Sequence, residues 1–264
     1  MTKRAYDYLA TYGLLAILGV EILAWTVLAV LLLPLLPQRW RRAAARYAMM
    51  GGFRFYLALL SACGVYRLEL DDLGPLVAGG PLILAPNHPS SVDAIIFLAH
   101  HPDLACILKP ELMGNLFLGP GARLAGFIRS EPPRRMIRGA IEELRHGSSV
   151  LLFPEGTRTT RVPFNPLTGS AAVIARHAQV PIQVLIIETD SPYLGKGWPL
   201  LKVPRLPIRC RVRLGRRLEP PQDARSCTAA LERELTRELA AAPQNSWLAG
   251  SDSPGGGKAL LDGR

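Results

Sequence analysis

An uninterrupted apolar segment, residues 9–33, most constrains what this chain can fold into. It holds 25 residues with one formal charge, Glu21, and no proline. As a helix it would be about 37 Å long, whereas the hydrocarbon core of a bilayer is about 30 Å thick. The segment therefore predicts a membrane-associated helix near the N-terminus. Glu21 indicates either a packed polar contact or a helix that lies shallowly in the membrane.

A secretory signal peptide is the alternative for this segment. Its apolar region would be about 7–15 residues long, followed by a cleavage site of small residues. Here the apolar run is longer, and it is followed by Pro34, Pro37 and a cluster of arginines. These features favour a retained helix over a cleaved signal.

The distribution of basic residues predicts an orientation. Only Lys3 and Arg4 precede the apolar segment, whereas five arginines follow it closely: Arg39, Arg41, Arg42, Arg46 and Arg54. The positive-inside tendency places everything after residue 38 in the cytoplasm, which predicts a bacterial-type inner-membrane protein with its main domain on the cytoplasmic side. A second apolar stretch, residues 48–66, is interrupted by Arg54 and predicts an interfacial or re-entrant helix.

Composition limits the remaining classes. The chain has 264 residues, 49% hydrophobic and 20% charged, which excludes extensive disorder and suffices for one large α/β core. A net charge of +10 favours anionic membrane surfaces or acidic substrates over nucleic acid, for which no binding motif is present. Its four cysteines form no metal-ligand or disulfide spacing, so they are interpreted as free thiols in a reducing compartment.

From residue 66 onward, short apolar runs alternate with helical patterns, which predicts an α/β fold with a largely parallel central sheet flanked by helices. The expected strands are residues 66–70, 82–85, 104–108, 126–128, 150–153, 182–187 and 208–214. The expected helices are residues 91–100, 132–146, 169–179 and 223–241. We therefore divide the chain into membrane-anchoring or interfacial helices (1–65), an α/β domain (66–242) and a disordered tail (243–264), which is rich in Ser, Pro and Gly.

Several common catalytic motifs are missing from the sequence. It has no phosphate-binding G-x-x-x-x-G-K-[ST], no G-x-S-x-G nucleophile turn and no H-E-x-x-H metal motif. The nearest approach to a dinucleotide fingerprint, residues 119–121, fails at its third glycine. These absences disfavour ATPases, serine hydrolases and zinc proteases.

One candidate site is the segment NHPSSVD, residues 87–93, directly after an expected strand. His88 would lie in the loop and Asp93 in the first turn of the next helix. There the carboxylate could bind one imidazole nitrogen and leave the other as a general base. The alternative is structural: Ser90 and Asp93 also form a capping-box pattern.

The second candidate is FPEGTR, residues 153–158, again directly after an expected strand. A turn of this composition presents backbone N–H groups, a hydroxyl and a guanidinium together, which suits a phosphate ester. The alternative is a tight turn at Gly156 with a local ion pair between Glu155 and Arg158.

These two segments, in this order and spacing, resemble the glycerolipid acyltransferases typified by 1-acylglycerol-3-phosphate acyltransferase. His88 and Asp93 match that family's N-H-x4-D block, residues 153–158 match its F-P-E-G-T-R block, and residues 181–184 resemble its apolar block with proline. The resemblance covers about residues 80–190. It implies an acyltransferase that moves a fatty acyl group from an acyl-CoA or acyl carrier protein thioester to the hydroxyl of a lysophospholipid, with 1-acylglycerol-3-phosphate as the expected acceptor.

The resemblance also implies roles for single residues. His88 would be the general base, and Asp93 would orient it. The acceptor's polar head would be held by Arg129, Glu155, Gly156, Thr157 and Arg158. No metal and no resident cofactor are expected.

Two departures from the family pattern concern the acceptor. The block at residues 126–130 is one residue tighter before Arg129, and Phe164 is not followed by the usual lysine. Two rivals therefore stay open: transfer to another hydroxyl or amine lipid, such as an aminolipid or polyene conjugate, and a non-catalytic lipid-binding protein.

Two basic clusters could bind anionic lipid, an acidic carrier protein or coenzyme A phosphates. One is a helical stripe of Arg134, Arg138 and Arg145. The other surrounds the last strand and comprises Arg205, Arg209, Arg211, Arg213, Arg216 and Arg217. The alternative for each cluster is a solvated basic face.

Overall fold

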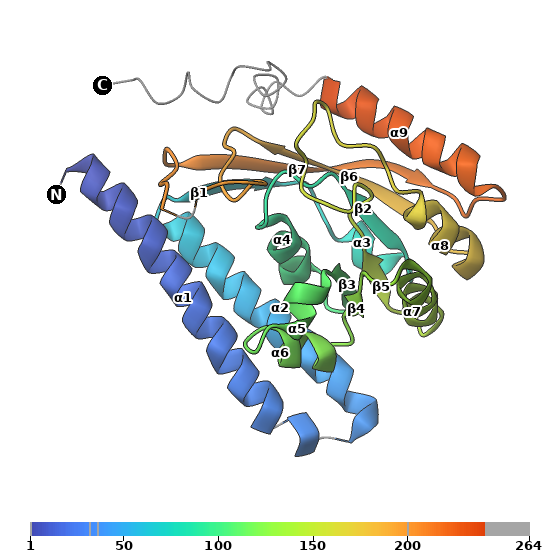
Figure 1. Cartoon of the computed structure of the whole chain (residues 1–264), viewed down its shortest axis with the longest axis horizontal. Coiled ribbons are helices and arrows are strands. Elements are labelled where there is room, and N and C mark those ends of the chain that lie inside the picture. The colour runs from blue at the N-terminus through green and yellow to red at the C-terminus, as the bar shows by residue number, and fades with distance from the viewer. Residues whose placement is uncertain (1, 32, 36, 200, 241–264) are drawn as a thin grey trace.

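A computed structural model describes residues 2–31, 33–35, 37–199 and 201–240, so the predicted tail lies outside the described residues. A seven-stranded sheet has helices on both faces, and a helical hairpin runs along one of them (Figure 1). This arrangement confirms the predicted α/β class. The strands are β1 (Tyr66–Leu70), β2 (Ile83–Pro86), β3 (Leu104–Leu108), β4 (Ile128–Arg129), β5 (Ser149–Leu151), β6 (Ile182–Thr189) and β7 (Ile208–Leu218).

The sheet order is β1-β7-β6-β2-β5-β3-β4. Every neighbouring pair is parallel except β6 and β7, which are antiparallel. The central strand β2 therefore lies between β5 and β6, and all three run in the same direction. The loops that follow β2 and β5 leave the same edge of the sheet, which is where ligands bind in open α/β folds.

Both faces of β2 are buried, which explains its continuous apolar sequence. Leu82, just before the strand, and Leu84 belong to a core shared with α2 (Gln38–Ala62) and α4 (Asp93–His100). Ile83 and Ala85 belong to a second core on the opposite face. That second core is covered by α7 (Pro133–Arg145), α8 (Ser170–Ala178) and α9 (Ala224–Ala240).

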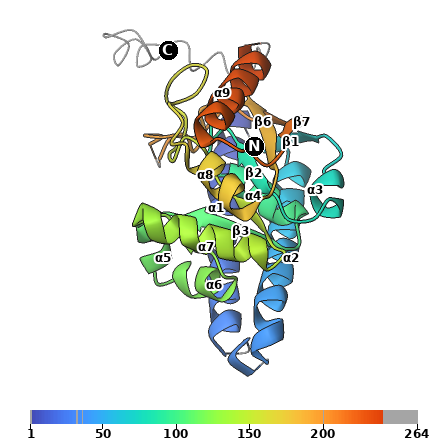
Figure 2. The same ribbon diagram turned by 90° about the vertical axis from the view of Figure 1, so that its right-hand side faces the viewer.

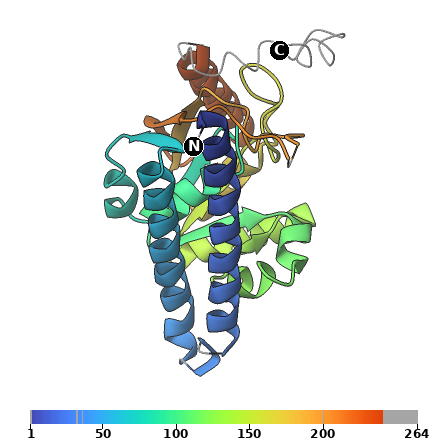
Figure 3. The ribbon, with the colours of Figure 1, turned by 90° about the vertical axis from the view of Figure 1, so that its left-hand side faces the viewer.

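The N-terminal helices form an antiparallel hairpin. Helix α1 (Lys3–Leu31) is followed by the short η1 (Leu33–Leu35) and then α2, and the two long helices lie side by side (Figure 3). Among the described residues, α1 alone is long and apolar enough to cross a membrane. The expected separate helix at residues 48–66 is wrong in extent: α2 begins at Gln38, because no proline interrupts the alanine-rich segment that contains the arginines.

Glu21 makes a contact between the two helices. A Cβ atom added to Gly52 of α2 would clash with the Glu21 Oε1 atom, so the glycine leaves the space that the carboxylate occupies. This contact agrees with the packed polar interpretation of Glu21. The hairpin also shares a core with the sheet, because Tyr56, Leu57 and Leu60 belong to the same cluster as Leu84 of β2.

Arg46 of α2 ties the hairpin to the α/β domain. It is 5% exposed, and its Nε donates to the carbonyl of Ala125 at 2.8 Å. One Nη donates to Ser148 Oγ at 2.7 Å and pairs with Asp103, and the other pairs with Glu143 Oε2 at 2.7 Å. Arg46 belongs to the arginines that predict the orientation of the chain in the membrane, but in the fold it is buried and paired with acidic side chains.

Short helices were missed in the sequence, because four to six residues show no readable periodicity. They are α3 (Pro75–Ala78), α5 (Pro110–Gly114) and α6 (Gly119–Leu124). The near-miss dinucleotide segment, residues 119–121, is the first turn of α6. Figure 2 shows α5 and α6 beside the hairpin, on the side opposite α3.

We predict that Arg46→Ala strongly lowers the stability of the protein. Removing the guanidinium leaves the buried Glu143 carboxylate without this partner, and breaking a buried ion pair costs about 3–5 kcal/mol. Denaturant or thermal unfolding in one detergent measures the change. The control is Arg42→Ala. Arg42 also pairs with the Glu143 carboxylate, but the Arg42 side chain is 59% exposed. Its expected cost is about 0–1 kcal/mol, and equal losses for the two variants would contradict the prediction.

Candidate active site

The loop after β2 is fixed to the neighbouring strand β6 by Asn87. Its side chain is buried, its Nδ2 donates to the carbonyl of Ile187 at 2.9 Å, and its Oδ1 accepts from the Ile187 N–H at 2.7 Å. The amide thus replaces the next ladder pair of the sheet. The following residue, His88, is held at the carboxyl edge of β2.

His88 and Asp93 are in contact, as the spacing predicted. The Nδ1 atom of His88 lies 2.9 Å from Oδ2 of Asp93, which begins α4. The same oxygen accepts a hydrogen bond from the Ser90 N–H at 2.8 Å, so the carboxylate also makes the capping contact offered as the alternative. With Nδ1–H donating to Asp93, Nε2 is the nitrogen left to accept a proton.

The environment of the pair differs on its two sides. Asp93 is 1% exposed, and burial raises its pKa, while hydrogen bonds from His88 and Ser90 oppose that rise. The His88 side chain is 16% exposed and lines a cavity. Its ring stacks on Phe153, with centroids 3.7 Å apart and planes inclined by 16°. The imidazole is therefore held on one face and at Nδ1, and the cavity lies beside it.

Glu155 joins the two candidate loops. It is 5% exposed, and Oε1 accepts from the His88 N–H at 3.1 Å and from the Thr159 hydroxyl at 2.6 Å. Its Oε2 accepts from the Asn165 N–H at 2.7 Å. Burial raises the pKa of this carboxyl, and these three hydrogen bonds oppose the rise. Both oxygens are thus occupied by donors of the protein, and Glu155 acts on the site by shaping its loops.

Gly156, Thr157 and Arg158 line the cavity beside His88. Gly156 has a φ of +67°, a conformation that favours glycine, and it forms the turn. The alternative ion pair between Glu155 and Arg158 is not formed. Arg158 instead uses Nη1 to donate to the Leu194 carbonyl at 2.8 Å, to the Gly195 carbonyl at 3.0 Å and to the Ser91 hydroxyl at 3.0 Å, while Nε and Nη2 bind no described residue.

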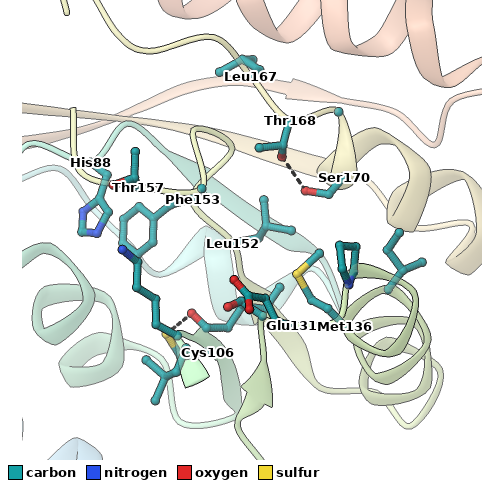
Figure 4. A pocket seen from close by; sticks show the side chains of 18 of the residues that line it. His88, Cys106, Glu131, Met136, Leu152, Phe153, Thr157, Leu167, Thr168 and Ser170 are labelled. Carbon is teal, nitrogen blue, oxygen red and sulfur yellow. Dashed lines mark hydrogen bonds between the residues drawn. The ribbon is translucent and has the colours of Figure 1, made fainter. Parts of the chain in front are cut away.

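The cavity has a volume of about 1290 Å³ and extends from the His88–Phe153 stack along the ends of β3 and β5 (Figure 4). One wall is apolar and includes Leu152 and Met136, whereas Leu167 lies apart from them, beyond Thr168 (Figure 4). Polar groups from the starts of α8 and α9 line the far part: Thr168, Ser170, Arg225 and Thr228. The cavity therefore combines a basic group and a histidine with a long apolar wall.

Lys109, a cation that no sequence motif marks, also lines this cavity. It follows β3 directly and precedes Pro110, the first residue of α5. The usable signal was its position at the end of an expected parallel strand. Arg129, the arginine predicted to bind the acceptor's polar head, is exposed on β4 and does not line the cavity. Its neighbours Ser130 and Glu131 do line it.

The cysteines do not offer a nucleophile here. All four are free thiols, in agreement with the sequence, and Cys106 lines the cavity. Burial raises the pKa of Cys106 to about 12, so its thiol stays protonated at neutral pH. Among the described residues, no group of three or more His, Cys, Asp or Glu side chains could hold a metal ion.

The two basic clusters differ in exposure. Arg134, Arg138 and Arg145 lie exposed on α7. On β7, Arg209 and Arg211 are exposed, whereas Arg213 pairs with Glu188 and Glu238 between the sheet and α9. Part of the second cluster is therefore an internal ion-pair network.

Comparison with known proteins points to one family. A family model described as Acyltransferase matches residues 67–188. A 1-acyl-sn-glycerol-3-phosphate acyltransferase of Pseudomonas aeruginosa is 25% identical over 188 residues, covering 69% of this chain and 72% of that protein. A lyso-ornithine lipid O-acyltransferase of the same species is 28% identical over 154 residues, covering 54% of this chain and 58% of that protein.

The fold has a solved counterpart. The 1-acyl-sn-glycerophosphate acyltransferase PlsC of Thermotoga maritima superposes with a TM-score of 0.71 and 20% identity. The match covers 90% of this chain and 97% of that structure. At this identity the likeness concerns the fold, and it extends beyond the α/β domain into the N-terminal helices.

We predict that Glu155→Gln destabilises the protein by about 1–3 kcal/mol, the cost of leaving a buried hydrogen-bonding group unsatisfied. The amide would place a donor against one of the donors that now bind the two carboxylate oxygens. Thermal unfolding measures the loss. Glu142→Gln, on the exposed side of α7, is the control and should stay within about 0.5 kcal/mol. A neutral result for Glu155→Gln would show that the carboxylate does not hold the two loops together.

Proposed function

We propose that the chain is a member of the glycerolipid acyltransferase family typified by 1-acylglycerol-3-phosphate acyltransferase, and that it acylates the free hydroxyl of a lysophospholipid with His88 as general base. The observation that carries the proposal is the His88–Asp93 contact at the wall of a cavity that also holds cationic groups. We take 1-acylglycerol-3-phosphate as the acceptor and an acyl thioester as the donor.

In the proposed reaction, His88 Nε2 removes the proton of the acceptor hydroxyl as its oxygen attacks the thioester carbonyl carbon. The carbon–sulfur bond breaks, the thiolate leaves, and the imidazolium returns the proton to sulfur. Asp93 holds the ring through Nδ1 and stabilises its charged form. No enzyme nucleophile takes part, which agrees with the protonated Cys106 thiol in the same cavity.

Two cations suit the acceptor's phosphate. Arg158 lines the cavity that contains His88 and makes its hydrogen bonds to described residues through Nη1, and Lys109 lines the same cavity. Charge-assisted hydrogen bonds from such groups orient a phosphate and bring the acceptor hydroxyl to the base. Gly156 and Thr157 add the backbone and hydroxyl of their turn to this part of the cavity.

The donor is proposed to be a thioester of coenzyme A or of acyl carrier protein, with its acyl chain along the apolar wall of the cavity. Leu152 and Met136 supply that wall. The long apolar α1 supports a membrane-bound protein, and the arginines after residue 38 support placement on the cytoplasmic face of a bacterial-type inner membrane.

A second acceptor class has specific support. One relative is named a lyso-ornithine lipid O-acyltransferase, the lysine expected after Phe164 is absent, and Arg129 lies outside the cavity. The experiment that separates the acceptors is acyl transfer from a labelled thioester to lysophosphatidate and to lyso-ornithine lipid, presented in the same vesicles. A preference of tenfold or more for the aminolipid would overturn the choice of a phosphate acceptor.

We predict that His88→Ala lowers the turnover number by at least about 10²-fold, the usual contribution of a general base. Asp93→Asn should be impaired to a smaller extent, because the side-chain geometry survives and the charge does not. The control is His146→Ala, an exposed histidine that follows α7 and lies outside the cavity, which should retain wild-type turnover. More than a tenth of wild-type turnover in folded, membrane-bound His88→Ala protein would contradict its role.

We also predict that Arg158→Lys and Lys109→Ala each raise the Michaelis constant for lysophosphatidate about tenfold to a hundredfold, with little change for the donor. The loss corresponds to hydrogen bonds to a charged group, about 1.5–3 kcal/mol. Arg129→Ala should change neither constant, because Arg129 does not line the cavity. If Arg158→Lys affects both substrates alike and lowers the melting temperature, its role is to hold the Leu194–Gly195 backbone.

A further inference from the structure

An exposed apolar turn connects α5 to α6. Leu112, Leu116 and Phe117 are 40%, 76% and 51% exposed, although each is a large hydrophobic side chain. The turn is ordered by Asn115, whose Oδ1 accepts hydrogen bonds from the N–H groups of Phe117 and Leu118 at 2.8 and 3.0 Å. The backbone therefore holds these side chains outward. We call residues 112–117 the α5–α6 turn.

This turn is attached to α1. The Thr26 hydroxyl donates to the Phe117 carbonyl, and the Trp25 indole packs so closely on Gly121 of α6 that there is no room for a Cβ atom at that position. On the same part of α1, Leu23 and Val27 are 45% and 50% exposed. The α5–α6 turn thus continues the apolar flank of α1, beside which α6 lies in Figures 1 and 2.

The residues that lead into this turn also form a wall of the cavity. Residues 108–112 line it, including Lys109 and Leu112, whereas Leu116 and Phe117 do not. One short stretch of chain therefore separates the site that contains His88 from an apolar outer surface. Next to it lies Arg123, an exposed arginine whose Nη1 binds the carbonyl of Met113 at 2.7 Å.

We propose that the α5–α6 turn inserts Leu116 and Phe117 into the interfacial region of a lipid bilayer beside α1, and that the lipid acceptor enters the cavity past Leu112. The occupant is a lipid surface because the turn is continuous with the chain's most apolar helix and is flanked by a cation suited to anionic headgroups. The entry route rests on the proposed function, and the insertion does not.

Insertion is tested without any reaction. In full-length protein carrying Cys63→Ser, which leaves three buried cysteines, Leu116→Cys is labelled with an environment-sensitive fluorophore. The protein is reconstituted in phosphatidylethanolamine–phosphatidylglycerol vesicles with or without nitroxide-labelled acyl chains. We expect at least twofold quenching at position 116. Little quenching is expected for Val77→Cys, a 44% exposed residue on α3, across the hairpin from the turn (Figure 2).

The entry route is tested with the double variant Leu116→Glu/Phe117→Glu. For acceptor in vesicles, kcat/KM should fall at least tenfold, whereas a short-chain acceptor dissolved below its micelle concentration should be used within twofold of wild type. Val77→Glu is the matched control and should change neither value. Equal losses on both acceptors would overturn the route and indicate a damaged cavity wall.

The outcomes separate this proposal from the proposed function. If wild-type protein acylates no lysolipid, the function is wrong, yet quenching at position 116 still decides whether the turn is in the bilayer. If position 116 is unquenched, the insertion is wrong even in an active enzyme. A blue shift at position 116 that depends on protein concentration, and not on vesicles, would identify a second copy of the chain as the occupant and overturn the proposal.

Discussion

The arrangement of the site depends on the hydrogen bonds that the buried Glu155 carboxylate accepts from two loops. Two loops leave neighbouring parallel strands, and neither has a repeating backbone pattern that would fix it. Glu155 accepts hydrogen bonds from the backbone of one loop at His88 and from the other at Thr159 and Asn165. A carboxylate that binds only protein donors is costly to bury and costly to leave unpaired. Its position therefore couples the histidine loop to the turn that carries Arg158.

Much of this site could be predicted from local sequence. The strands before residues 87 and 153 are predicted to be buried because their residues are apolar on both faces. Parallel strands bring the loops that follow them to one edge of the sheet. The contact between His88 and Asp93 could be predicted because His88 lies in the loop and Asp93 in the first turn of the next helix. The few residues between them keep the two side chains close. The role of Glu155 did not follow, because its partners at residues 88 and 165 lie far apart in the sequence.

Charge gave the least reliable guidance, because the sequence does not show which arginines have acidic partners. Arg46 is one of the arginines that predict orientation across the membrane, yet it pairs with Glu143, nearly a hundred residues away in the sequence. Arg129 was placed on the acceptor, but its two-residue strand at the sheet edge leaves it exposed. Lys109 carries no motif of its own, and only the position of its strand beside β5 brings it to the cavity.

The central strand has a consequence for how accurately the base can be placed. His88 stands two residues beyond Pro86, the last residue of β2, and a slip of one residue would move it by about 3.3 Å. The slip would also turn every side chain of the strand to the opposite face. Leu84 would then meet the core built for Ile83 and Ala85, and both cores would lose their packing. The position of the His88 imidazole therefore depends on how the aliphatic side chains of β2 pack into the cores on its two faces.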